Sequence, residues 1–168
     1  PQQLEETGAD CIWGDVVHIT DEGRPVRYMS GAVFNPALFS LGIMPPHPTF
    51  YARRQSIVQA GGFNAKYRIA GDFELMIKLY KQPGFRGIYA GALITVMRIG
   101  GVSTDGVKAT LLSSQEIGTA LVDNGLKSVP ALVNLRYGPK LVEKIRGLFM
   151  AALGVDFATE AHAAMKGR

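Results

Sequence analysis

The strongest local constraint in this chain is a set of prolines crowded into four residues. They are Pro45, Pro46 and Pro48. Each proline fixes its own φ angle and disfavours the helical region for the residue before it. We therefore expect His47 to lie in rigid, extended backbone, where an imidazole would be well placed as a ligand or a base.

The segment after the prolines predicts a strand followed by two helices. β-branched and aromatic residues favour a strand over 48–53, and a short helix over 54–60 would end at two left-handed glycines, Gly61 and Gly62. Apolar residues recur at helical spacing over 72–82. Asp72 stands at the start of this run, so we expect it to be the N-cap.

The rest of the chain adds strands and then turns helical. Strands are expected over 10–20, 85–90 and 93–99, with Pro25–Met29 as the hairpin partner of the first. Helices are expected over 111–124 and around 141–152, the second with a basic amphipathic stripe. The fold class is therefore α/β: a mixed sheet flanked by helices, with a helical C-terminal third.

Composition limits the class of protein. With 47% hydrophobic and 19% charged residues, the chain is typical of a globular domain rather than a disordered one. Its net charge of +4 arises in the second half, which could meet a nucleotide diphosphate, a lipid phosphate or an anionic membrane, or simply be solvated. The basic residues are not interleaved with stacking aromatics, which argues against nucleic acid. One cysteine, Cys11, favours a reducing compartment.

Several short segments follow one another along roughly the first two thirds of the chain. They are PHPTFYARR (46–54), AGGFN (60–64), IAGDFEL (69–75) and GGVS (100–103), preceded by DCIWGDV (10–16) and DEGR (21–24). In order and spacing they resemble the acceptor-side, C-terminal portion of a family 2 glycosyltransferase of the GT-A fold. The two preceding segments, 10–16 and 21–24, resemble the strand and hairpin that follow the metal-binding Asp-x-Asp of such enzymes.

The resemblance implies an inverting transferase of polysaccharide biosynthesis at the cell envelope. It would move a sugar from a nucleotide-diphosphate sugar to a glycan or lipid-linked acceptor, with a divalent metal (Mn or Mg) in the intact enzyme. Asp72 matches the general base, although Gly71 stands where the family often has a second acidic residue. A helix cap without catalytic function is the other interpretation of Asp72.

The resemblance also suggests substrate-binding residues, each with a structural alternative. They are His47, Arg53, Arg54, Gly101 and Ser103. His47 is also a candidate metal ligand or a packed residue, and the arginines either grip phosphate or begin a helix in solvent. The loop with Gly101 and Ser103 either covers the active site or is a plain connector. Asp15 either touches nucleotide or metal or is a structural carboxylate near a bulge.

The resemblance divides the chain into an acceptor-side part, 1–104, and a helical extension, 105–168. Because no nucleotide-binding half or Asp-x-Asp precedes these segments, we expect a fragment that is inactive alone, exposes apolar surface and forms homo-oligomers. The expected location is the cytoplasm, with peripheral contact at the inner face of the membrane. The alternative function is a non-catalytic glycan-binding or assembly module derived from such an enzyme.

Overall fold

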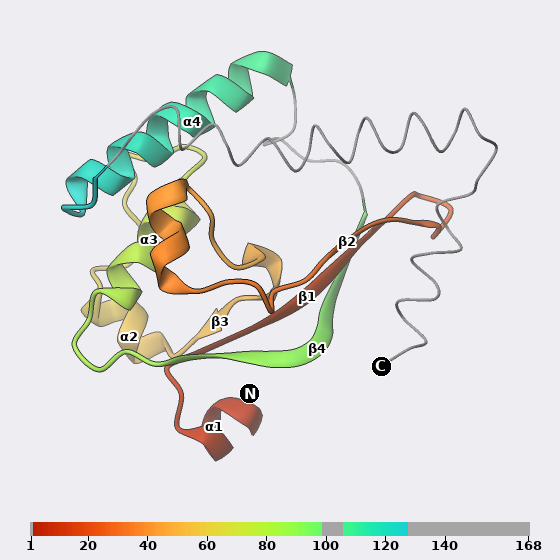
Figure 1. Ribbon diagram of the computed structural model, residues 1–168, viewed down its shortest axis with the longest axis horizontal. Coiled ribbons are helices and arrows are strands. Elements are labelled where there is room, and N and C mark those ends of the chain that lie inside the picture. Colours follow the sequence, from red (N-terminus) through yellow and green to blue (C-terminus); the bar gives the residue numbers. More distant parts are fainter. Residues whose placement is uncertain (1, 99–105, 128–168) are drawn as a thin grey trace.

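The computed structural model describes residues 2–98 and 106–127, and it has a mixed α/β architecture (Figure 1). The elements in chain order are α1 (Gln2–Thr7), β1 (Cys11–Ile19), β2 (Pro25–Met29), the 3₁₀ turns η1 (Pro36–Leu41) and η2 (His47–Thr49), β3 (Tyr51–Ala52), α2 (Arg54–Gln59), α3 (Gly71–Tyr80), β4 (Gly87–Arg98) and α4 (Gly106–Asp123). The α/β class predicted from the sequence is confirmed.

Strand β1 is the centre of a four-stranded mixed sheet. Along one edge it pairs in parallel with β4 over its whole length. Its other edge is shared by two antiparallel partners, β3 at the start of β1 and β2 at its end. The hairpin predicted between 10–20 and 25–29 is therefore confirmed, and β1 is the strand that pairs with all three others.

The two strands predicted over 85–90 and 93–99 form one strand, β4. Gly91 has a φ of +66°, a left-handed conformation that lets the strand bulge and continue instead of ending. Opposite the bulge, the register with β1 shifts on both sides of Asp15. A Cβ at Gly14 would lie 2.5 Å from the Ala92 carbonyl oxygen, so only glycine allows the two strands this close.

The strand predicted over 48–53 is mostly absent. His47–Thr49 form a 3₁₀ turn, and only Tyr51–Ala52 pair with β1. The expected extended backbone at His47 is therefore wrong, because the φ of Pro48 also fits a 3₁₀ turn that the Thr49 N–H closes on the Pro46 carbonyl at 2.9 Å. The turn is nevertheless rigid.

Helices α2, α3 and α4 gather at one end of the molecule, while the β1–β2 hairpin and the second half of β4 reach away from them (Figure 1). The predicted helix over 54–60 is confirmed as α2, and Gly61 and Gly62 beyond it have the expected positive φ. A chain of edge-to-face aromatic contacts joins sheet and helices in one core. Its rings are Trp13, Phe34, Phe39, Phe73, Tyr80 and Phe85.

Helix α4 belongs to the same core. Its Ile117, Ala120 and Leu121 are buried against α3, and Gly125 ends the helix as expected. The domain boundary expected after residue 104 and the helix expected around 141–152 lie outside the described residues. Within the described ranges, no helix is long and apolar enough to cross a bilayer. Large apolar side chains are exposed at several positions, among them Val33 and Phe63.

Candidate active site

The fold brings together two residues that the sequence singled out independently. His47 Nδ1 lies 3.7 Å from Asp72 Oδ2, the first contributed by η2 and the second by the first turn of α3. The side chain of His47 is 53% exposed and that of Asp72 is 30% exposed. At this separation they form an ion-pair contact rather than a hydrogen bond, so both keep polar atoms available to a ligand.

The backbone around His47 is held by two threonine side chains. Thr49 is fully buried, and its hydroxyl accepts from the Gly14 N–H at 3.1 Å and lies within donating distance of the Pro46 and Gly14 carbonyls, at 2.7 and 3.0 Å. Thr95 of β4 donates to the Pro48 carbonyl at 2.9 Å. The proline turn is therefore tied to β1 and β4, which holds the imidazole at a fixed place above the sheet.

Asp72 lies inside α3 and not at its cap. The N-cap is Ala70, whose side chain makes no capping bond, so the predicted capping role of Asp72 is wrong. Asp72 Oδ1 accepts a hydrogen bond from the N–H of Phe73, the next residue, at 2.8 Å. Its Oδ2 lies 3.7 Å from His47 Nδ1, and the Asp72 side chain is 30% exposed, so this oxygen can accept from a ligand.

The start of α3 is capped from a distant part of the chain. Glu116 of α4 accepts hydrogen bonds from the backbone N–H groups of Arg68, Ile69 and Ala70 at 2.9, 2.7 and 2.8 Å. Burial alone would raise the pKa of Glu116, but these bonds outweigh it and lower the pKa below its usual value. Glu116 therefore fixes the backbone immediately before Asp72.

Sequence reasoning missed Glu116, because its partners are backbone groups that carry no side-chain signature. A second link to α4 joins Asp123 to the side chains of Lys66 and Tyr67. Lys66 Nζ and Asp123 Oδ2 form an ion pair that ties this loop to the end of α4. Together the two acidic residues of α4 hold both ends of the loop that leads into α3.

His18 of β1 lies close to two other basic side chains. They are His47 of η2 and Arg27, the cross-strand partner of His18 on β2. Burial first, and then the charges of Arg27 and His47, lower the pKa of His18. His47 thus has a histidine near it on the side of the sheet and the carboxylate of Asp72 near it on the side of α3.

The arginines proposed to bind substrate are engaged elsewhere or exposed. Arg53 donates from Nε to the Ala9 carbonyl at 2.8 Å and from its guanidinium to the Leu4 carbonyl, so it fastens α1 to the start of α2. Arg54 begins α2 on the surface. Neither is joined to the His47–Asp72 pair by an interaction within the described residues. Gly101 and Ser103 lie outside the described residues.

Asp15 has the structural role that its place at a bulge suggested. It is 3% exposed, and its carboxylate accepts from the Tyr28 hydroxyl, Ser30 Oγ (3.1 Å), the Gly31 N–H (2.8 Å) and the Tyr89 hydroxyl (2.8 Å). Burial would raise its pKa, but these hydrogen bonds prevail and lower it. All four donors come from the protein, so little capacity is left for a nucleotide or a metal.

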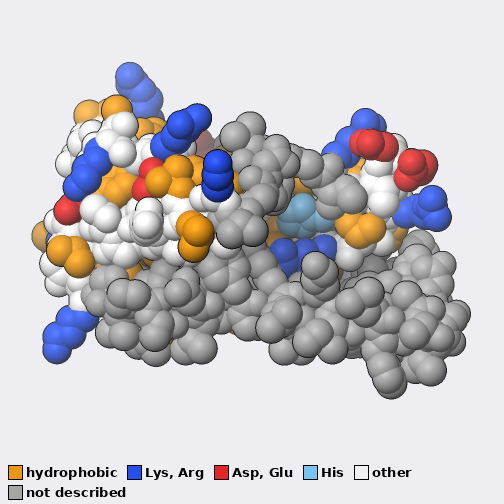
Figure 2. Space-filling model, turned by 90° about the horizontal axis from the view of Figure 1, so that it is seen from above, with side chains coloured by type: hydrophobic (Ala, Val, Ile, Leu, Met, Phe, Trp, Pro, Cys, Tyr) orange, Lys and Arg blue, Asp and Glu red, His pale blue; other side chains and the backbone are white. Residues whose placement is uncertain are grey.

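Figure 2 shows basic side chains at both ends of the face, with acidic side chains among them. Among residues 2–98 and 106–127, no group of three or more His, Cys, Asp and Glu side chains is placed to hold a metal ion. The His47–Asp72 pair supplies two ligands at most.

Comparison with known proteins found no match, so the class of protein has to be inferred from the candidate site. No protein-family model matches the chain, and no curated protein and no solved structure matches it.

Proposed function

We propose that this chain carries the acceptor-side half of an inverting glycosyltransferase site, with Asp72 as the general base. The observation that supports this proposal is the half-open carboxylate of Asp72. One of its oxygens is held by the Phe73 N–H, and the other faces His47 in a place that a hydroxyl group can reach. A fixed, accessible carboxylate beside an imidazole is what the deprotonation of an acceptor hydroxyl requires.

The proposed reaction uses Asp72 once. As the acceptor oxygen attacks the anomeric carbon of the donor sugar, its proton passes to Asp72 Oδ2. The bond from the anomeric carbon to the diphosphate oxygen breaks, and the nucleotide diphosphate leaves with the electron pair. Attack opposite the leaving group inverts the configuration. Rigid attachment of the loop before α3 by Glu116 would keep the base within hydrogen-bonding distance of the acceptor.

His47 would act beside the base rather than in its place. Its ring nitrogen lies 3.7 Å from Asp72 Oδ2, and its side chain is 53% exposed, so it can reach a ligand held at Asp72. We propose that it binds an oxygen of the donor phosphate or of the acceptor sugar. The sequence-based assignments of Arg53, Arg54, Gly101 and Ser103 to substrate remain proposals.

The divalent metal expected in the intact enzyme does not fit the described residues. Mn and Mg need about six ligands in octahedral geometry, whereas the pair here offers one imidazole nitrogen and one carboxylate whose second oxygen already accepts from Phe73. We therefore assign no step of the reaction to a metal held by His47. A metal site, if the enzyme uses one, needs carboxylates from a further part of the protein.

The test is a transfer assay with the 168-residue chain and with the longest product of its gene. Uridine and guanosine diphosphate sugars are supplied with Mn²⁺ or Mg²⁺ and a set of glycan and lipid-linked acceptors. We expect acceptor-dependent release of nucleotide diphosphate from the longer product only, with inverted anomeric configuration. Retained configuration would exclude this mechanism. If neither form transfers sugar but either binds a glycan, the non-catalytic binding module is the better description.

A further inference from the structure

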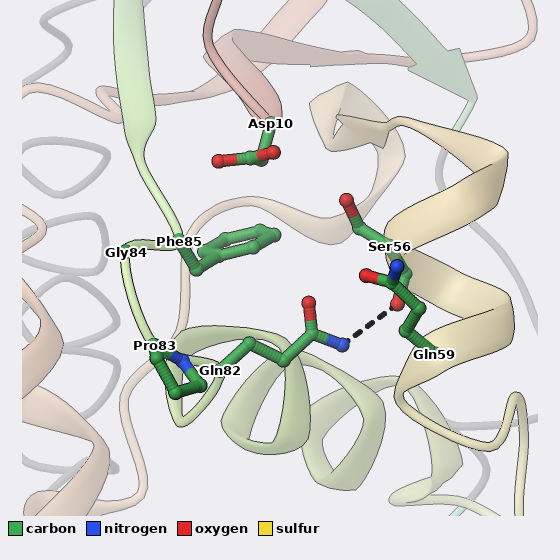
Figure 3. A pocket seen from close by; sticks show the side chains of 7 residues that line it. All are labelled: Asp10, Ser56, Gln59, Gln82, Pro83, Gly84 and Phe85. Carbon is green, nitrogen blue, oxygen red and sulfur yellow. Dashed lines mark hydrogen bonds between the residues drawn. The ribbon is translucent and has the colours of Figure 1, made fainter.

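A separate pocket lies at the other end of α3. It is lined by the start of β1, the end of α2 and the turn that follows α3 (Figure 3): Asp10, Ser56, Gln59, Gln82, Pro83, Gly84 and Phe85. Its volume of about 330 Å³ is near the lower end of the roughly 300 to 1,000 Å³ that is typical of small-molecule sites. It has room for one small ring.

The most informative group in this pocket is the hydroxyl of Ser56. The residue is 5% exposed, and Ser56 Oγ makes no hydrogen bond with the described residues. Its carbonyl, in contrast, accepts from Gln82 Nε2 at 2.8 Å. In Figure 3 the hydroxyl points from α2 into the pocket, on the side facing Asp10. A hydroxyl that lines a pocket without a hydrogen bond inside the protein can both donate to and accept from a ligand.

Other polar atoms in the pocket have spare hydrogen-bonding capacity. Asp10 Oδ2 accepts from the Arg86 N–H at 2.8 Å, which fixes the carboxylate and leaves its second oxygen available. Gln82 uses its amide nitrogen on Ser56 and keeps its amide oxygen. Gln59 is exposed at the rim, with both a donor and an acceptor. The pocket wall therefore carries both hydrogen-bond acceptors, on Asp10 and Gln82, and groups that can donate, on Ser56 and Gln59.

An aromatic ring provides the apolar part of the lining. Phe85 is partly buried, and an edge-to-face contact with Tyr80 at 5.0 Å holds its ring. In Figure 3 the ring projects between Asp10 and Gln82. A ring fixed in this way can pack against the C–H face of a saturated ring ligand.

We propose that this pocket binds one neutral sugar unit. Each hydroxyl of a sugar donates and accepts, which matches the carboxylate, carboxamide and hydroxyl groups on the wall, and its C–H face matches Phe85. The carboxylate of Asp10 disfavours a phosphate or a carboxylate ligand by charge repulsion. The unit can be a free monosaccharide or one residue of a longer glycan, since the pocket is open to solvent at Gln59.

This site is distinct from the candidate active site. Asp72 is in the first turn of α3 and the pocket lies beyond its last turn, and the ten residues of the helix span about 15 Å. The proposal therefore does not rest on transfer at Asp72. Occupation of the pocket and activity at Asp72 are measured separately, and either can fail without the other.

The test is a titration of the full 168-residue chain followed by amide NMR. The probes are glucose, galactose and N-acetylglucosamine, and the β-1,4-linked trisaccharides of glucose and N-acetylglucosamine. We expect saturable shifts confined to residues 56–59 and 82–86 and to the two glutamine side chains. Stronger binding of a trisaccharide than of its monosaccharide would assign the pocket to a glycan, and equal binding to a free sugar.

Two variants and one control decide whether the wall makes the contacts. Ser56→Ala removes only the hydroxyl, and Gln59→Ala alters an exposed side chain, so both should stay folded; each should weaken sugar binding about 3- to 10-fold. Val58→Ala, at a 63% exposed position on the other side of the same helix, should leave affinity unchanged. The proposal is overturned if no sugar gives saturable shifts, if Val58→Ala weakens binding as much as Ser56→Ala, or if ethanolamine, a cation that could pair with Asp10, binds more tightly than every sugar.

Discussion

Asp15 and Asp72 are both carboxylates at irregular points of the fold, and their surroundings are opposite. Asp15, at the bulge between β1 and β4, is 3% exposed and accepts four hydrogen bonds from the protein. Asp72, in the first turn of α3, is 30% exposed and accepts one, from the N–H beside it. The first carboxylate is saturated, and the second retains capacity for a substrate.

The difference lies in what holds the chain around each carboxylate. Around Asp15, donors from β2, the loop after it and β4 converge, so the carboxylate ties three segments to β1. Before Asp72, the chain is held by Glu116, which accepts hydrogen bonds from three N–H groups of the preceding loop. Asp72 itself accepts only the hydrogen bond from the Phe73 N–H among the described residues.

The largest expected effect is on catalysis by Asp72. In the form of the protein that transfers sugar, Asp72→Asn keeps the size of the side chain and an oxygen that can accept from Phe73, but it removes the proton acceptor. We expect kcat to fall by about 10²- to 10⁴-fold, with little change in the free energy of unfolding. Single-turnover kinetics at saturating donor and a thermal melt measure the two quantities.

The matched control for that variant is Asp21→Asn, in the exposed β1–β2 turn. It should leave both rate and stability unchanged. An Asp72→Asn protein that turns over at the rate of the unmodified protein would remove the catalytic assignment and favour a binding module.

The next effect is on stability, at Asp15. Asp15→Ala takes the acceptor away from four donors: one buried backbone N–H, that of Gly31, and three partly buried hydroxyl groups. We expect the free energy of unfolding to drop by about 3 kcal/mol, since each buried donor that loses its partner costs on the order of 1 to 3 kcal/mol and the costs overlap. Urea denaturation measures it. A loss no larger than that of Asp21→Ala would contradict the anchoring role.

The pH dependence gives an independent check on the same region. The folded protein lowers the pKa of Asp15, so the stability it contributes is complete above the unfolded pKa of about 3.9 and is lost as pH falls through the folded value. Asp15→Asn does not titrate there. Its unfolding free energy should therefore decline less than that of the unmodified protein on acidification.

Elements with local signals were predictable from the sequence, and elements made by long-range packing were not. The hairpin of β1 and β2, α2 with its glycine stop and α4 with Gly125 follow from turn residues and periodicity. The 85–99 region was divided in two because Gly91 is also a usual strand breaker. Only its pairing with β1, where Gly14 admits a close approach, shows that it bridges one strand.

The candidate site divides in the same way. His47 and Asp72 were found from their residue types and neighbours, and the structure places them 3.7 Å apart. Glu116 could not be found, since its bonds go to the backbone of residues 68–70, and a backbone group carries no mark in the sequence. The cap at Asp72 was predicted wrongly because α3 begins at Gly71, one residue earlier than the apolar periodicity indicated, so Ala70 takes the cap position.

A smaller effect is expected at Glu116. Glu116→Gln keeps one acceptor oxygen but loses the charge that strengthens its bonds to three N–H groups, so we expect about 1 kcal/mol less stability. Since the loop before Asp72 loosens, kcat should also fall by several-fold in the active form while donor affinity stays unchanged. Glu5→Gln, exposed on α1, is the control. Equal stability of the two variants would show that the clamp contributes nothing.

The smallest effect, and the sharpest comparison, is the coupling between His47 and Asp72. The two side chains are 3.7 Å apart and exposed, so their ion-pair contact should be worth less than about 0.5 kcal/mol in stability. A double-mutant cycle of His47→Gln and Asp72→Asn, read by urea denaturation, measures it.

The matched cycle of Tyr28→Phe and Asp15→Asn should give more than about 1 kcal/mol, because that hydrogen bond is charge-assisted and Asp15 is 3% exposed. If the two coupling energies are equal, the contrast between a saturated and an available carboxylate is wrong. If the His47–Asp72 coupling is small in stability but large in the activation free energy of transfer, the pair acts in the reaction and not in the fold.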